Sequence, residues 1–204
     1  MAVLKIYGYA QSRAMRTLWL CEELGLPYDL VHTGTTDGST RTAAYLKVNP
    51  AGHIPAIDDN GFMLSESLAI NLYLAKKHGK LYPRDAQGEA KAWQWSFWVM
   101  SELDASIVRW ITHGMLLAPE ARDVKIARES REAMEWPLTV LNGALAGRQY
   151  LIEPDTFTVA DLNVASVLYR LLFVDLAGKQ NLHDWVRRCW DRPAAKKVRA
   201  MREG

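Results

Sequence analysis

A serine at a helix start is the first candidate for chemistry in this sequence. Ser12 stands directly before a run of apolar residues at helical spacing, so its hydroxyl lies near a helix N-terminus. Unpaired backbone N–H groups and the helix dipole favour negative charge there, and they lower the pKa of a thiol held at that place. The hydroxyl could donate a hydrogen bond to a thiolate, which stabilises the charged nucleophile. A helix cap is the alternative role of such a serine.

A second candidate is the stretch NPAGHIPAIDDNGFMLSES over residues 49–67, which joins a turn, a hairpin and another helix start. Because proline cannot donate to a strand ladder, Pro55 belongs at a sheet edge, at a first strand position or at a bulge. Glu66 and Ser67 then begin a helix, where an anion would again find unpaired N–H groups. Capping alone would also explain this serine.

Composition and charge exclude several classes of function. The chain of 204 residues has 25 Lys and Arg against 23 Asp and Glu, a net charge of +2, so neither nucleic acid nor a membrane surface is indicated as a partner. The N-terminus lacks the layout of a signal peptide, and no apolar run approaches the length of a membrane span. Cys21 and Cys189 form no CxxC, which favours a reducing cytoplasm. The five histidines show no metal-ligand spacing, so we expect no metal.

The N-terminal part of the chain alternates between short strands and helices. We predict strands over residues 3–7, 28–32, 54–58 and 62–64, and helices from Ser12 to Gly25, over residues 43–48 and over residues 65–78. Asn60-Gly61 is typical of a hairpin turn between the last two strands. The order β-α-β followed by β-β-α indicates a thioredoxin-like arrangement whose first two strands are parallel.

The remainder of the chain has helical periodicity almost throughout. We predict a long helix over residues 89–111, another from near Pro119 that Pro137 kinks or ends, and an apolar helix to residue 177 behind the capping box Thr158–Asp161. Two short helices follow, separated at Arg192-Pro193. The fold class is therefore an α/β thioredoxin-like N-terminal domain over residues 1–79, a linker over 80–87 and an all-α C-terminal domain over 88–204.

Five stretches together resemble the cytosolic glutathione transferase family. They are SRAMRTLWLCEELGLPYDL, NPAGHIPAI followed by SESLAINLYL, WQWSFWVMSEL, FTVADLNVA and DWVRRCWDRPA, and in this order they span nearly the whole chain. The sequence looks most like the bacterial serine-type members, which carry a Ser-Arg-rich turn before the first helix. The resemblance implies a cytoplasmic, homodimeric detoxification enzyme that joins glutathione to a hydrophobic electrophile.

The resemblance also assigns roles to residues of the second stretch. Pro55 would follow a cis peptide bond and turn the N–H and C=O of Ile54 outward, where the cysteinyl main chain of glutathione could pair with them like an added strand. Ser67 would grip the γ-glutamyl carboxylate and Glu66 would help with the amino group. His53 would touch the glycyl end, although a solvated loop histidine is the alternative.

Four residues compete for the role of thiol activator. Ser12 is the candidate that the helix-start argument favours. Counting back from the arginine of the first helix, the activator of several serine-type classes would fall on Gln11. Tyr7 and Tyr9 are further rivals, because tyrosine-type members place their activator at the end of the first strand.

The second substrate would bind near Tyr9, Trp110 and His113, if the fourth helix faces the thioredoxin-like domain as it does in this family. For Trp110 a role in core packing is the favoured alternative, since the eight tryptophans of so small a protein mostly serve packing. Tyr82 and the tryptophans of the fourth helix are the only hints of the homodimer in the residues themselves.

Two other functions remain open. One keeps glutathione but changes the reaction to isomerisation, reductive dehalogenation or thiol–disulfide exchange. The other is a non-catalytic binding module, because a fold alone does not decide function. The intact Ile54-Pro55 and Glu66-Ser67 pairs favour retained glutathione binding.

Overall fold

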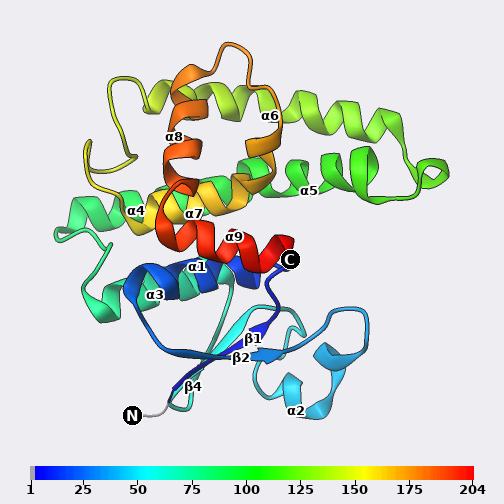
Figure 1. Cartoon of the computed structure of the whole chain (residues 1–204), viewed down its shortest axis with the longest axis vertical. Coiled ribbons are helices and arrows are strands. Elements are labelled where there is room, and N and C mark those ends of the chain that lie inside the picture. Colours follow the sequence, from blue (N-terminus) through cyan, green and yellow to red (C-terminus); the bar gives the residue numbers. More distant parts are fainter. Residues whose placement is uncertain (1–2) are drawn as a thin grey trace. The chain divides into compact units, whose positions relative to one another are not determined.

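The computed structural model describes residues 3–204, which divide into two compact units (Figure 1). The first unit holds the described residues up to Pro83 together with Trp190–Gly204, and the second holds Arg84–Cys189. The sequence placed a linker at residues 80–87, close to this change of unit. It also assigned residues 88–204 to one helical domain, whereas the structure groups residues 190–204 with the sheet.

A mixed four-stranded sheet forms the centre of the first unit. Its strands lie in the order β2 (Tyr28–His32), β1 (Leu4–Gly8), β3 (Ala56–Asp59) and β4 (Phe62–Ser65). β1 is parallel to β2 and antiparallel to β3, so that Tyr7 lies opposite both Val31 and Ala56. This arrangement confirms the predicted thioredoxin-like fold, including the parallel first pair that the intervening helix requires.

Four helices accompany the sheet: α1 (Ala14–Leu24), α2 (Ala43–Leu46), α3 (Ser67–His78) and α9 (Pro193–Glu203). α1 ends where Gly25 adopts the left-handed conformation, as the Gly-x-Pro pattern predicted. α1 contacts both α3 and α9, and Figure 1 shows α9, in red, beside α1, in blue. The rings of Trp19 and Trp190 lie 4.5 Å apart, so the C-terminal segment packs on the core of the first unit.

The second unit contains α4 (Ala86–Val99), α5 (Ala105–Ile111), α6 (Val124–Ala144), α7 (Val159–Val167) and α8, which runs from Gln180 to Trp190. Only the last residue of α8, Trp190, is grouped with the first unit. The long helix expected over residues 89–111 is interrupted by a π-helical turn at Met100–Asp104, for which the sequence carries no breaker. Pro137 does not end α6, because its neighbours Met134 and Leu138 are buried and packing holds the helix together. The helix expected to reach residue 177 ends at Val167 and continues as a 3-10 stretch.

α7 is entirely buried and depends on the side chain of Asp161. The predicted capping box is present: Asp161 Oδ2 accepts hydrogen bonds from the Thr158 amide and hydroxyl, both at 3.0 Å. Asp161 Oδ1 accepts from the Leu151 amide at 2.8 Å and from Trp185 Nε1 at 3.0 Å. Burial raises the pKa of Asp161, and the hydrogen bonds work against that rise. Within residues 3–204 no helix combines the length and apolarity of a membrane span.

Candidate functional site

Gly8, the last residue of β1, is the point where three segments of the first unit meet. A Cβ atom at Gly8 would lie 2.7 Å from Ala14 Cβ, 3.6 Å from Ser12 Oγ and 3.7 Å from Ile54 Cβ. Its φ of +147° also favours glycine. The fold therefore brings Ser12 and Ile54, two predicted site residues far apart in the sequence, close to the same point beside Gly8. Sequence reasoning missed Gly8, for which the only signal is a glycine at the end of a strand.

The loop before β3 exposes backbone groups beside Gly8. The Ile54–Pro55 peptide bond is cis, as the resemblance implies. β3 begins only at Ala56, which pairs with Tyr7, so the N–H and C=O of Ile54 lie outside the strand ladder. This backbone can therefore pair with an added extended peptide.

The same loop is held from α2 and presents His53 to solvent. The carbonyl oxygen of His53 accepts hydrogen bonds from the Tyr45 hydroxyl at 2.6 Å and from Asn49 Nδ2 at 2.7 Å, while its side chain is exposed. Burial raises the pKa of Tyr45 to about 12, so this hydroxyl stays a donor at neutral pH. The structure thus fixes the backbone of His53 and leaves its imidazole available to a ligand.

Arg41 supplies a second basic group beside this loop. Arg41 Nη1 donates to the carbonyl oxygen of Ala51 at 3.3 Å and occupies the space beside Gly52 that a Cβ there would need. Gly52 has a φ of +64°, which again favours glycine. Sequence reasoning missed Arg41, because it lies in a polar loop with no periodic pattern.

The start of α3 forms the other end of the candidate site. Glu66, at the N-cap position, has φ 71° and ψ 107°, a strained conformation for a residue with a side chain, and its side chain forms no cap hydrogen bond. Ser67 is buried and its hydroxyl accepts a hydrogen bond from Arg16 Nη1 at 3.3 Å. A helix N-terminus with a buried guanidinium behind it is well suited to an anion.

Ser12 closes the turn between β1 and α1. Its hydroxyl donates to the carbonyl oxygen of Tyr9 at 2.7 Å and accepts from the Ala14 amide at 3.1 Å. The hydroxyl thus closes the turn and accepts the first amide of α1, while the N-cap position itself is taken by Arg13 and not by Ser12. The hydroxyl also lies 3.6 Å from the position that a Cβ on Gly8 would take, and Ile54 Cβ lies 3.7 Å from that position.

The two rival tyrosines are turned toward other partners. The ring of Tyr7 meets the ring of Tyr45 edge-on, with centroids 5.9 Å apart. The ring of Tyr9 is tilted against His32 at 5.7 Å, and its hydroxyl lies 3.4 Å from Thr35 Oγ1.

The third rival, Gln11, is exposed, and its Nε2 donates to the carbonyl oxygen of Met201 at 3.4 Å. Cys21 is no rival, because it is buried and burial raises the pKa of its thiol to about 12. Of these residues Ser12 is the one whose side chain lies, with that of Ile54, within 3.7 Å of the position that a Cβ on Gly8 would take.

The residues expected to line the second-substrate pocket lie in different units. Trp110 is half-buried on α5, and His113 Nδ1 accepts a hydrogen bond from the Asp123 amide at 3.3 Å. Both belong to the second unit, whereas Tyr9 belongs to the first, so the shared pocket stays a prediction. Within residues 3–204 no three His, Cys, Asp or Glu side chains are grouped so that they could hold a metal ion.

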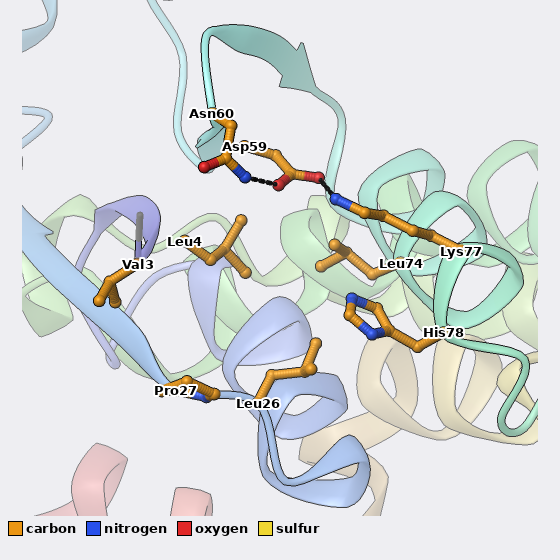
Figure 2. A pocket seen from close by; sticks show the side chains of 9 residues that line it. All are labelled: Val3, Leu4, Leu26, Pro27, Asp59, Asn60, Leu74, Lys77 and His78. Atoms are coloured by element: carbon orange, nitrogen blue, oxygen red, sulfur yellow. Dashed lines mark hydrogen bonds and ion pairs between the residues drawn. The ribbon is translucent and has the colours of Figure 1, made fainter. Parts of the chain in front are cut away.

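A cavity of about 340 Å³ lies at the opposite end of β1, β3 and α3 (Figure 2). Its apolar wall includes Leu4, Leu26 and Leu74. Asp59 accepts hydrogen bonds from Asn60 Nδ2 at 3.0 Å, from the Tyr73 hydroxyl at 2.7 Å and from the Lys77 ammonium. The carboxylate at this end is therefore already satisfied by the protein itself. The full lining is Val3, Leu4, Leu26, Pro27, Asp59, Asn60, Leu74, Lys77 and His78.

Comparisons with known proteins identify the family of the chain. A family model described as glutathione S-transferase, N-terminal domain, matches residues 2–76, and one described as glutathione S-transferase, C-terminal domain, matches residues 105–193. Glutathione S-transferase GstB of Escherichia coli (strain K12) is 31% identical over 194 residues, which cover 92% of each chain. Disulfide-bond oxidoreductase YghU of the same strain is 26% identical, over 97% of this chain and 74% of that one.

A solved structure of a glutathione S-transferase also resembles this chain over nearly its whole length. The theta class glutathione S-transferase from Xanthomonas axonopodis pv. citri, solved with glutathione bound, superimposes with a TM-score of 0.90. It is 26% identical in sequence, and the match covers 97% of each chain.

Proposed function

The chain belongs to the glutathione S-transferase family, and on that premise we propose that it binds glutathione at the Gly8 end of the sheet and joins the sulfur to an electrophilic carbon. The observation that carries the proposal is the meeting of Ser12 and Ile54 at the end of β1, where both lie within 3.7 Å of the position that a Cβ on Gly8 would take. That meeting sets a hydroxyl and a helix N-terminus beside backbone groups that can pair with a peptide.

Glutathione is an extended tripeptide with a carboxylate at each end and a thiol in the middle. Its cysteinyl main chain pairs with the N–H and C=O of Ile54 in this proposal. The γ-glutamyl carboxylate lies at the start of α3 near Ser67, with the Arg16 guanidinium behind it, and Glu66 faces the amino group. The glycyl carboxylate lies toward His53 and Arg41, whose charge supports that orientation.

The chemistry begins with loss of the thiol proton to solvent. The N-terminus of α1 and a hydrogen bond from the Ser12 hydroxyl stabilise the thiolate, so its pKa falls below the ordinary value of about 8.5. The sulfur lone pair then forms a carbon–sulfur bond with a hydrophobic electrophile. In a substitution the leaving group departs with its bonding electrons, and in an addition the neighbouring carbon takes a proton from solvent. The residues proposed for the second substrate are Tyr9, Trp110 and His113.

One observation favours a second reaction, glutathione-dependent thiol–disulfide exchange, since one relative is named a disulfide-bond oxidoreductase. This reaction uses the same bound thiolate but attacks a disulfide sulfur instead of carbon. A protein thiol is a poor participant, because Cys21 and Cys189 are both buried. Comparing turnover of an aryl halide with turnover of a mixed disulfide of glutathione separates the two reactions.

We also propose a homodimer in the cytoplasm. Exposed apolar side chains support the dimer: on β4 Phe62 is 49% exposed, and on α4 Trp93 and Phe97 are 45% and 68% exposed. Sedimentation of a monomer at micromolar concentration would remove this part of the proposal. Cys21 and Cys189 form no disulfide, which is compatible with a reducing compartment.

The test is a titration of glutathione into the wild type and Ser12→Ala, following thiolate absorbance of the bound ligand against pH. We expect glutathione to bind both proteins and its thiol pKa to fall in the wild type only. With an aryl halide, Ser12→Ala should reduce kcat about tenfold to a few hundredfold, or roughly 1.4–3 kcal/mol. An equal fall in both proteins would assign activation to Tyr7, Tyr9 or Gln11. No binding to either protein would favour the non-catalytic module.

A further inference from the structure

The last turn of α9 contacts the loop that carries Ser12. Arg202 Nη1 donates hydrogen bonds to the backbone oxygens of Ala10 at 3.1 Å and of Ser12 at 3.3 Å. In the other direction, Gln11 Nε2 donates to the carbonyl oxygen of Met201 at 3.4 Å. These contacts join positions at least 190 residues apart in the sequence, and all of them lie in the first unit.

Ion pairs hold α9 against α1, and they fix the position of Arg202 near the end of α9. Arg192 donates to both carboxylate oxygens of Glu23, from Nε at 2.7 Å and from Nη2 at 2.8 Å. One turn further along, Lys197 Nζ donates to Glu22 at 2.7 Å. A two-bonded guanidinium–carboxylate pair fixes orientation as well as distance. The direction of α9, and with it the position of Arg202, is thus set by α1.

The loop needs such a support at the moment when Ser12 acts. In the structure the hydroxyl of Ser12 donates to the carbonyl oxygen of Tyr9, which also accepts the Ser12 amide at 3.0 Å. A hydroxyl has a single proton, so donating to a thiolate means releasing the Tyr9 carbonyl. The backbone oxygens on either side of Gln11 remain bound to Arg202 during that exchange, and the turn can keep its shape.

We propose that Arg202 is a positioning residue for the Ser12 loop, which makes the C-terminal helix part of the glutathione site. This inference rests on the proposed function. Arg202 acts through the backbone of Ala10 and Ser12 and does not touch the reacting sulfur. Without it, more of the closure falls to the bonds that Ser12 itself makes, through its amide and its hydroxyl, to the Tyr9 carbonyl, so the hydroxyl is less available to the thiolate.

The test compares the wild type with Arg202→Ala and with Lys197→Ala. Both variants remove one cation from α9, but Lys197 contacts α1 and not the loop. In Arg202→Ala we expect the thiol pKa of bound glutathione to rise by about one pH unit and kcat with an aryl halide to fall about tenfold. KM for glutathione should change less than about threefold, because Ile54 and Ser67 still bind the tripeptide. Lys197→Ala should keep the wild-type thiol pKa.

A thiol pKa in Arg202→Ala equal to that of the wild type would overturn the proposal, as would the same rise in Lys197→Ala. If Arg202→Ala does not fold, Arg202→Lys, whose shorter reach weakens both bonds, is held to the same criteria.

Amide hydrogen exchange over residues 10–14 tests the positioning without any ligand. We expect exchange in Arg202→Ala to be about tenfold faster in this segment than in Lys197→Ala, since local opening governs exchange. Unchanged exchange would overturn the inference. If the wild type fails to bind glutathione, the proposed function fails, and the exchange rates alone decide whether Arg202 holds the loop.

Discussion

The two ends of the sheet in the first unit use their polar groups differently. Where β1 ends and α3 begins, the backbone of Ile54 lies outside the ladder and α3 starts without a side-chain cap. Where β1 begins and α3 ends, Asp59 is satisfied by Asn60, Tyr73 and Lys77 beside a cavity (Figure 2). A cavity alone therefore does not identify the site. The end that keeps open hydrogen-bonding groups is the better candidate for binding a polar tripeptide.

The largest expected effect comes from a Gly→Ala substitution at the Gly8 end of the sheet, and the same substitution at the opposite end is its control. Gly8→Ala places a Cβ 2.7 Å from Ala14 Cβ at a φ of +147°, so we expect a loss of about 2–5 kcal/mol in the free energy of unfolding and no glutathione binding. Gly61→Ala at the opposite end also has positive φ but meets nothing within 4 Å. It should cost about 1 kcal/mol and leave binding intact. Denaturant unfolding and calorimetry measure both.

The next largest effect is expected at the end of the sheet where Asp59 lies, and glutathione binding at the other end should not change. Asp59→Ala removes the common acceptor of Tyr73 and Lys77, and because Lys77 is partly exposed to solvent we expect a loss of about 1–2 kcal/mol in unfolding free energy. Glutathione affinity should stay within about twofold of the wild type. A larger loss of affinity would mean that the two ends are coupled.

The contribution of Asp59 to stability should also depend on pH. Burial alone would raise its pKa, but the hydrogen bonds from Lys77 and Tyr73 outweigh burial and lower the pKa. Because the folded-state pKa lies below the unfolded value of about 3.9, the interaction stabilises the protein above about pH 4. That stability is lost as the pH falls through the folded-state pKa. The difference in unfolding free energy between the wild type and Asp59→Asn should therefore shrink below about pH 4.

Local sequence signals predicted much of this architecture, while contacts between distant segments could not be read from them. The Asn60-Gly61 turn, the Gly25 helix stop and the Thr158 capping box each depend on a few neighbouring residues, and each is present. The contacts of Asp161 with Trp185, and of Arg202 with Ala10, join segments that no local pattern relates. For the same reason the sequence did not predict that α9 groups with the unit that contains the sheet.

The candidate site was likewise predicted where local residue types carry the signal, and missed where the signal lies in contacts between distant segments. The residue types at the helix starts indicated an anion, and the thiolate and the roles of Ile54 and Ser67 came from the family resemblance. Gly8 and Arg41 were missed, since their importance lies in what surrounds them: a Cβ would not fit at Gly8, and Arg41 fills the space beside Gly52. Steric closeness of this kind appears only when the chain is folded.

Two serines flank Glu66 and offer a matched comparison within the binding end. Ser67→Ala removes the hydroxyl that contacts Arg16 at the start of α3, so we expect glutathione affinity to fall about tenfold, or roughly 1.4 kcal/mol. Ser65, the last residue of β4, lies outside the helix, and Ser65→Ala should leave affinity within about twofold. Titration calorimetry separates them, and equal losses would show that the effect is not specific to the hydroxyl at the start of α3.

The smallest expected effect concerns the exposed imidazole of His53. The backbone of His53 is held by Tyr45 and Asn49 whatever its side chain is, so His53→Ala should preserve the loop. Only a solvent-exposed contact to the glycyl carboxylate is lost, which predicts a fall in glutathione affinity of about twofold. Unchanged affinity would mean that His53 is a solvated loop residue.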